Sequence, residues 1–185
     1  MQDISQIILD LVQNSIAADS TKVQIEIKKD ILRNLLIITI NDNGKGMSQE
    51  ITKGCTDPFY TTRTTRSVGL GLAFTKMLSE QSGGFFNIDS QENQGTRLNF
   101  SFLLNHWDRP PFGKLEDTYI SLLILNPNVE FNISISTDEK SFTLKSQDVY
   151  ENIGESHVSE AWVIEWLREY LRENFYHLLK EEDKS

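Results

Sequence analysis

The 185-residue sequence has a single cysteine, four prolines and no long apolar run. Cys55 has no second cysteine to pair with, so no disulfide can form within the chain. No stretch approaches the roughly 18 consecutive apolar residues of a membrane-spanning helix. The N-terminus, Met1-Gln2-Asp3-Ile4, lacks the basic start and small-residue cleavage site of a signal peptide. These absences predict a cytoplasmic protein.

Positive charge is also scarce, with 18 Lys+Arg against 27 Asp+Glu and a net charge of −9. Residues 1–105 hold 10 basic against 11 acidic residues, whereas residues 106–185 hold 8 against 16. An acidic surface repels phosphate groups, which argues against nucleic acid and against an anionic membrane as partners. The change in charge coincides with Pro110-Pro111. We therefore predict a domain at 1–104, a linker at 105–117 and an acidic α+β extension at 118–185.

A turn with two glycines follows the apolar run at 35–40, which predicts a buried strand. The strand delivers Asp42 into this turn, just before Gly44 and Gly46. A carboxylate there can accept a hydrogen bond from a ligand N–H, and glycines let a ligand approach the backbone. The alternative is that Asp-Asn-Gly serves only as ordinary turn chemistry.

Apolar residues at spacings of three and four predict a helix over residues 3–18, with Asp3 as its N-cap. Asp10 and Asn14 lie four residues apart, beside the apolar stripe. Their oxygens suit a hard cation such as Mg²⁺, although both side chains could simply face water.

The rest of residues 1–104 alternates strands with helices. Strands are expected at 22–29, 85–89 and 96–104, a short helix at 48–53 and a polar loop at 57–67. Gly69-Leu70-Gly71-Leu72 opens a further helix that ends at Gly83-Gly84. Glycines at a helix start expose backbone N–H groups, which favours anion binding.

Several of these segments, in this order, resemble the nucleotide site of the GHKL ATPase superfamily, which includes gyrase, heat-shock chaperone, histidine kinase and mismatch-repair ATPases. Residues 10–15 resemble the N box, 42–46 the first glycine box and 69–72 the second. Residues 58–63 are similar to the phenylalanine box and lid of histidine kinases in particular, and Gly95-Thr96 to a late strand start. The resemblance implies an α/β two-layer sandwich with a mixed sheet and helices on one face, the Bergerat ATP-binding fold, plus a small C-terminal α+β extension.

The resemblance also implies ATP and Mg²⁺ as cofactors. Asp42 would accept a hydrogen bond from the adenine amino group, with support from Thr96, and Gly44 and Gly46 would lie against the base. Asn14, with Asp10, would bind the metal. Arg63 would reach the terminal phosphate, with Arg66 as a weaker candidate, although either arginine could be solvated. The full implied cofactor-binding set is Asn14, Asp42, Gly44, Gly46, Met47, Phe59, Thr62, Arg66, Gly69, Leu70, Gly71, Leu72 and Thr96.

The chain departs from the family pattern in several places. Asp10 stands where the N box usually has Glu, and its side chain is one methylene shorter. A displacement of about 1 Å can lower the rate about a hundredfold, so Asp10 is a doubtful catalytic base. Ala17 replaces a common lysine, and Ser67-Val68 precedes Gly69 where a further glycine is usual. The chain begins at the N-box helix, and no acidic residue follows His106, His157 or His177. We therefore expect no dimerisation or phospho-acceptor segment and no self-phosphorylation of the histidine-kinase type.

In the extension we expect a helix at 115–125, strands at 129–136 and 141–145, and a long helix at 159–179. This last helix carries an apolar stripe that includes two aromatic residues: Val163, Trp166, Leu167, Tyr170, Leu171 and Leu178. Such a stripe either packs on its own domain or binds a partner.

Two functional hypotheses follow. The first is an enzyme, a stand-alone ATP-dependent phosphotransferase or ATPase that regulates a separate protein. The alternative is an ATP-dependent binding or sensor module with little or no turnover. The sequence identifies neither the protein partner nor the oligomeric state.

Overall fold

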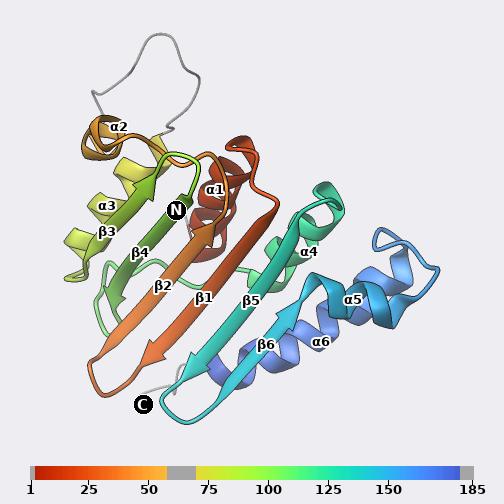
Figure 1. The fold of residues 1–185 in the computed structure, drawn as a ribbon. Helices are drawn as coiled ribbons and strands as arrows, with labels where there is room; N and C mark the ends of the chain where they lie inside the picture. The colour runs from red at the N-terminus through yellow and green to blue at the C-terminus, as the bar shows by residue number, and fades with distance from the viewer. Residues whose placement is uncertain (1–2, 58–69, 180–185) are drawn as a thin grey trace.

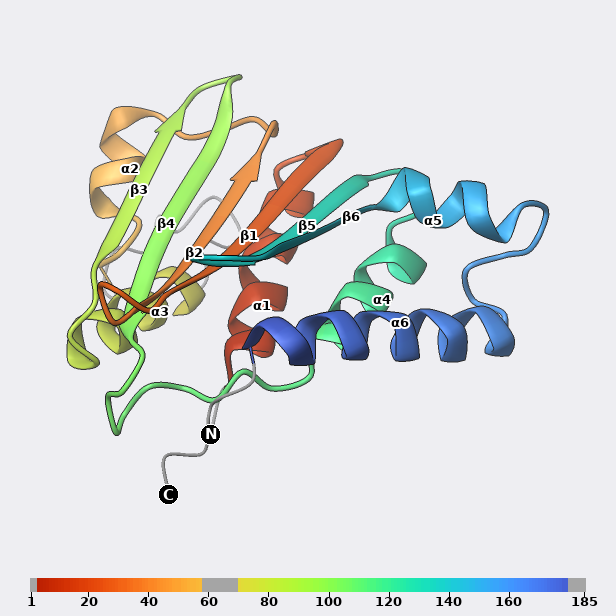
Figure 2. The same ribbon diagram turned by 90° about the horizontal axis from the view of Figure 1, so that it is seen from below.

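A six-stranded mixed sheet forms the centre of the computed structural model, which describes residues 3–57 and 70–179 (Figure 1). The strand order is β3-β4-β2-β1-β5-β6, and α1, α3, α4 and α6 lie on one face (Figure 2). The predicted α/β fold, a mixed sheet with helices on one face, is confirmed. The strands are β1 (Lys22–Asp30), β2 (Leu35–Asp42), β3 (Phe86–Gln91), β4 (Gly95–Leu103), β5 (Glu130–Thr137) and β6 (Ser141–Lys145), and the helices are α1 (Ile4–Ala17), α2 (Gln49–Gly54), α3 (Leu70–Gln81), α4 (Leu115–Leu125), α5 (Ser146–Ile153) and α6 (Ala161–Leu179).

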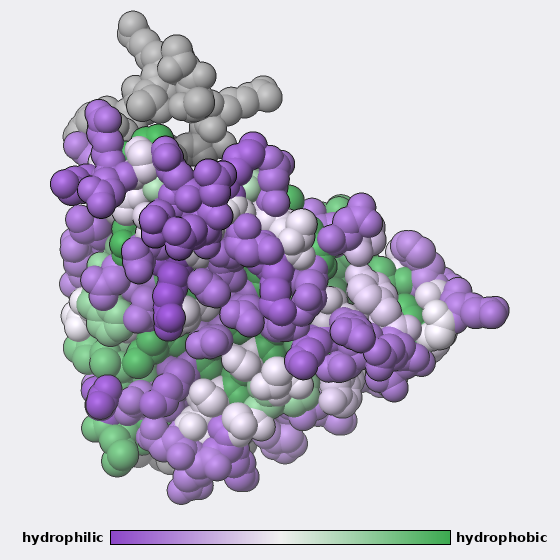
Figure 3. All heavy atoms as spheres, viewed as in Figure 1, coloured by the Kyte–Doolittle hydropathy of each residue, from purple (hydrophilic) through white to green (hydrophobic). Residues whose placement is uncertain are grey.

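Alternating side chains explain why the sheet has one covered face. In β1, Val23, Ile25 and Ile27 are buried, whereas Glu26 and Lys28, which alternate with them, are exposed. The uncovered face is mostly hydrophilic (Figure 3). The helices therefore pack on the apolar face of the sheet, and polar groups such as Asp42 lie at the ends of the strands.

The helix α1 begins where the sequence predicts. The Asp3 side chain accepts a hydrogen bond of 2.9 Å from the Gln6 amide, as an N-cap does. The segment before α4 also contacts this end, because the amides of Ile4 and Ser5 donate to the carbonyls of Pro111 and Phe112. Residues of the predicted linker therefore hydrogen-bond to the first turn of α1.

The strands of the extension continue the same sheet. β5 pairs in parallel with β1, with Ile133 opposite Ile25, and β6 pairs antiparallel with β5. The Tyr119 hydroxyl on α4 lies 3.3 Å from the carbonyl of Phe131 and 3.4 Å from that of Leu144, so α4 contacts both added strands. The boundary at 105–117 stays a prediction about domains.

One helix, α5, has no counterpart in the expectations from sequence. It starts directly after β6, where the Lys145 amide donates to the Asp148 carboxylate at 3.2 Å. Its inward apolar residues, Val149 and Ile153, are too few to establish a helical period. Within the described residues, no helix is both long and apolar enough to cross a bilayer.

Candidate functional site

The Asp42 carboxylate lies at the end of β2 and is 8% exposed. Its Oδ2 accepts a hydrogen bond of 2.6 Å from Ser15 Oγ on α1. Its Oδ1 accepts two, from Ser20 Oγ at 3.1 Å and from the Gly44 amide at 2.9 Å. A carboxylate offers about four acceptor positions, so one position, on Oδ2, remains for a further donor. The site can therefore recognise one N–H or O–H of a ligand.

The glycines of the turn are required by contacts within the protein. A Cβ at Gly44 would lie 2.5 Å from Ser20 Oγ and 2.7 Å from the Ala18 carbonyl oxygen. Gly46 has φ +62°, and a Cβ there would lie 1.9 Å from the Gln91 carbonyl oxygen. These contacts account for both glycines by backbone packing. The expected approach of a ligand to this turn stays a prediction.

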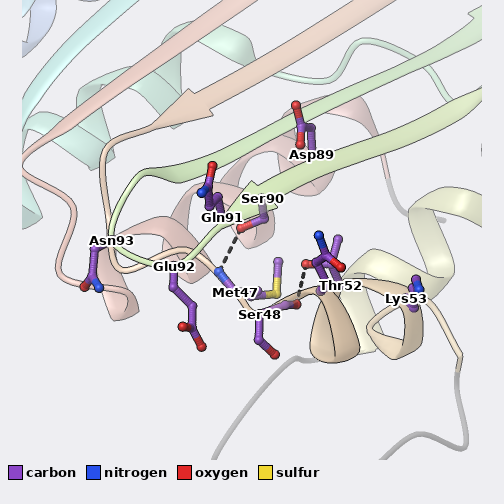
Figure 4. Close-up of a pocket in the computed structure, with 10 residues that line it drawn as sticks. Met47, Ser48, Thr52, Lys53, Asp89, Ser90, Gln91, Glu92 and Asn93 are labelled. Carbon is purple, nitrogen blue, oxygen red and sulfur yellow. Dashed lines mark hydrogen bonds between the residues drawn. The ribbon is translucent and has the colours of Figure 1, made fainter.

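Thr96 pairs with Asp42 across β2 and β4, so the backbones of the two residues lie side by side. Its Oγ1 lies 2.9 Å from Ser90 Oγ, which accepts a hydrogen bond of 2.9 Å from the Met47 amide. Ser90 therefore links the turn after β2 to the β3–β4 hairpin. Figure 4 shows the Ser90–Met47 bond at the edge of a cavity of about 660 Å³ between α2 and this hairpin. Asp42, Asn14 and Asp10 do not line that cavity.

The two predicted metal ligands lie one helical turn apart on α1. Asp10 is exposed and Asn14 is partly buried. The start of α3 lies beside them, because a Cβ built on Gly71 would be 3.9 Å from the Asp10 Cβ. Within the described ranges, no group of three or more His, Cys, Asp or Glu side chains could hold a metal by itself. A pair of oxygen ligands nevertheless fits Mg²⁺, which usually takes one or two protein ligands and completes its shell with phosphates and water.

The remaining predicted residues separate into two groups. Leu72 is 5% exposed and packs in the core, while the backbone of Leu70 begins α3. The other predicted residues lie outside the described ranges: Phe59, Thr62, Arg63, Arg66 and Gly69.

Three serines at the site were missed by sequence reasoning. Ser15 falls on the inward face of α1, which was a usable signal, because an inward hydroxyl in an apolar stripe needs a partner. Ser20 and Ser90 carry no such signal, since both lie in short polar stretches where serine is common.

Comparison with known proteins places residues 2–106 in an ATPase family. Residues 2–106 match the family described as histidine kinase-, DNA gyrase B- and HSP90-like ATPase. A putative sensor protein of Shewanella frigidimarina is 34% identical over 109 residues, covering 58% of this chain and 17% of that protein. The signal transduction histidine-protein kinase ArlS of Staphylococcus haemolyticus is 31% identical over 102 residues, covering 52% of this chain and 22% of that protein. The matched region thus spans less than a quarter of either relative.

The fold also resembles a solved structure, the N-terminal domain of a DNA repair protein. The TM-score is 0.54 at 18% sequence identity, and the match covers 84% of this chain and 58% of that chain. At this identity the likeness concerns the fold. Because it covers 84% of this chain, it reaches past the 105 residues of the family match.

Proposed function

Because this chain belongs to the family of histidine kinase-, DNA gyrase B- and HSP90-like ATPases, we propose that it binds ATP with Mg²⁺ and uses the nucleotide to regulate a separate protein. The resemblance predicted from the motifs is confirmed by the family match. The observation that carries the proposal is the Asp42 carboxylate, which is 8% exposed and has one acceptor position left on Oδ2.

That acceptor position would give the site a preference for adenine. The adenine amino group would donate to Asp42 Oδ2, whereas guanine carries an oxygen acceptor at the same ring position. Two acceptors facing each other leave a buried carboxylate without its partner, which costs about 1–3 kcal/mol. Ser15, Ser20 and the Gly44 amide hold the carboxylate in one orientation, so it need not reorganise when the base enters.

The metal and phosphate roles fall to α1 and the start of α3. Asn14 and Asp10 would hold Mg²⁺, which would offset the negative charge of the phosphates. Backbone N–H groups near Gly71 would bind the phosphates, since a helix N-terminus favours anions. The close approach of Gly71 to Asp10 supports this arrangement, because it brings the proposed phosphate and metal groups to one place.

The activity that best fits a regulatory ATPase domain is transfer of the γ-phosphate to a separate protein, or hydrolysis coupled to it. One observation favours a second candidate, a binding module with little turnover. Asp10 is exposed and is one methylene shorter than the usual Glu, so its carboxylate is poorly suited to orient an attacking water. In that case ATP would act only because the ATP-bound protein and the ATP-free protein have different affinities for the partner.

Calorimetric titration tests the shared part of the proposal. We expect ATP with Mg²⁺ to release or absorb heat on binding, and GTP to bind at least about tenfold more weakly, which is 1.4 kcal/mol. Absence of heat with folded protein would overturn the proposal. Phosphate release and γ-phosphate transfer, measured with a partner recovered by ATP-dependent pull-down, then separate the enzyme from the binding module.

A further inference from the structure

Helix α6 carries exposed aromatic side chains at the margin of its buried apolar stripe. Trp162, Trp166 and Tyr170 succeed one another at spacings of one turn and are 53%, 37% and 40% exposed. The rings of Trp166 and Tyr170 stack with centroids 6.0 Å apart and an interplanar angle of 13°. Together with Glu169, which precedes Tyr170, and Glu173, which follows it by three residues, these residues are named the α6 outer face.

The fold does not need this face for its core. The neighbouring apolar stripe of α6 is fully covered, with Val163, Leu167 and Leu171 each at 0% exposure. The predicted apolar stripe therefore separates in the structure. Its aliphatic members pack inward, whereas Trp166 and Tyr170 lie at its exposed margin. Large exposed aromatic groups arranged in this way are typical of binding surfaces.

The aromatic side chains are already held in place by their neighbours. Phe142 on β6 contacts Tyr170 edge-on, with centroids 5.7 Å apart. Trp162 Nε1 donates a hydrogen bond of 2.9 Å to Glu160 Oε2. Side chains that are ordered before binding lose less conformational entropy when a partner arrives. The α6 outer face is thus preorganised for contact.

Charge identifies the kind of partner. Both arginines of α6 are turned toward α4, since Arg168 pairs with Asp117 at 2.8 Å and Arg172 with Glu116 at 3.6 Å. Among the described residues, Glu169 and Glu173 have no cationic neighbour within ion-pair distance. Residues 146–179 contain seven Asp+Glu and two Arg, giving a net charge of −5. Within the described part of the chain, the aromatic side chains therefore lie beside two carboxylates, Glu169 and Glu173, that no cation pairs with.

We propose that the α6 outer face binds a basic, amphipathic segment of a separate protein. Its apolar side chains would pack on Trp162, Trp166 and Tyr170, and its cations would pair with Glu169 and Glu173. A second copy of this chain would bring the same carboxylates face to face, so like charge disfavours self-association here. The inference rests on the proposed function in one respect, namely that a separate protein is the target.

The probe is a synthetic 15-residue helix of leucine and lysine with its leucines on one face, and its control is the same pattern with glutamate in place of lysine. A Trp107→Phe background leaves only Trp162 and Trp166 as tryptophan reporters, since the chain has three tryptophans. We expect the lysine peptide to shift their fluorescence and the glutamate peptide to leave it unchanged. Raising the salt concentration should weaken the complex, because it screens exposed charges.

Matched charge reversals decide whether the α6 outer face is the site. Glu169→Lys with Glu173→Lys should raise the peptide Kd at least about tenfold. Glu26→Lys with Glu139→Lys makes the same change of net charge elsewhere and should leave the Kd within about twofold. Trp166→Ala, read by calorimetry, should also weaken binding at least about tenfold.

Three outcomes would overturn the inference: no binding of the lysine peptide, equal weakening by both charge reversals, or self-association of the wild type that the Glu169→Lys/Glu173→Lys variant abolishes. ATP titration of each variant keeps this test separate from the proposed function. If the protein binds the peptide but not ATP, only the nucleotide proposal is overturned. If the protein binds ATP but not the peptide, only the proposal that the α6 outer face is a docking site is overturned.

Discussion

Ser15 on α1 donates a hydrogen bond of 2.6 Å to Oδ2 of Asp42 at the end of β2. The two residues are 27 positions apart in the chain, and both are buried. This bond joins the helix that carries Asn14 to the strand that delivers Asp42. The proposed metal ligand and the proposed adenine acceptor are therefore held in one rigid arrangement.

Replacement of Ser15 by alanine should cost stability and affinity together. A hydrogen bond to a charged group contributes about 1.5–3 kcal/mol, and its loss leaves Oδ2 with an extra unfilled position. Urea unfolding should show a loss of that size, and the ATP Kd should rise. Ser20→Ala is the matched comparison, and its effect should be smaller because the Gly44 amide still donates to Oδ1. Equal effects of the two changes would contradict this account.

The Asp42→Asn variant tests recognition of the base. The new Nδ2 group is a donor, so it cannot accept the adenine amino proton, and the ATP Kd should rise at least about tenfold by calorimetry. Asp89→Asn on β3 removes the same charge from an exposed position and should leave ATP affinity unchanged. An Asp42→Asn protein that folds and binds ATP as tightly as the wild type would count against the assignment.

Much of the fold was accessible from the sequence because local patterns determine it. The alternation of Val23, Ile25 and Ile27 predicted a strand, and all three are buried in β1. The pairing of β5 with β1 was not accessible, since the register of strands about a hundred residues apart depends on tertiary packing. The short helix α5 was likewise not accessible, because its own residues show too little helical periodicity and it depends on its position after β6.

The candidate site divides in the same way. Motif order predicted Asp42 and Asn14 as site residues, and the structure brings their elements together through Ser15. The donors to Asp42 could not be deduced, because a serine that hydrogen-bonds a buried carboxylate looks the same in sequence as a surface serine. For Gly44 and Gly46 the pattern suggested room for a ligand, whereas the structure shows protein atoms against both positions.

The Asn14→Ala variant tests the metal site. Loss of the carboxamide oxygen should weaken ATP binding in Mg²⁺ by about tenfold, or 1.4 kcal/mol, and leave binding in EDTA unchanged. Gln13→Ala is a suitable control, because Gln13 is the exposed neighbour on the same helix. Equal loss of affinity with and without Mg²⁺ would mean that Asn14 supports the base or the backbone, and not the metal.

Gly95 at the start of β4 should not tolerate a side chain. It has φ +89°, and a Cβ would lie 1.9 Å from the Asp42 carbonyl oxygen, which is backbone. Gly95→Ala should destabilise the protein by more than about 2 kcal/mol in urea unfolding, because the collision adds to the 1–2 kcal/mol cost of a positive φ. Gly154→Ala provides the control, since Gly154 has φ +60° with no atom within 4 Å of the added Cβ. A similar loss at both glycines would show that conformation, and not the collision, sets the cost.

Asp30 at the end of β1 should make the stability depend on pH. The Arg33 amide donates to its carboxylate at 3.0 Å and Lys28 Nζ lies 3.3 Å away, and these interactions lower the pKa of Asp30 below its ordinary value of 3.8. A carboxyl group with a lowered folded-state pKa contributes stability above its unfolded pKa, and that contribution is lost as the pH falls through the folded pKa. The difference in unfolding free energy between wild type and Asp30→Asn should therefore be largest at pH 6 and decrease below about pH 4. Urea unfolding at pH 6, 4 and 3 measures it, with Asp89→Asn as the exposed control. A difference that stays constant across this range would show that Asp30 acts through packing, since packing does not titrate.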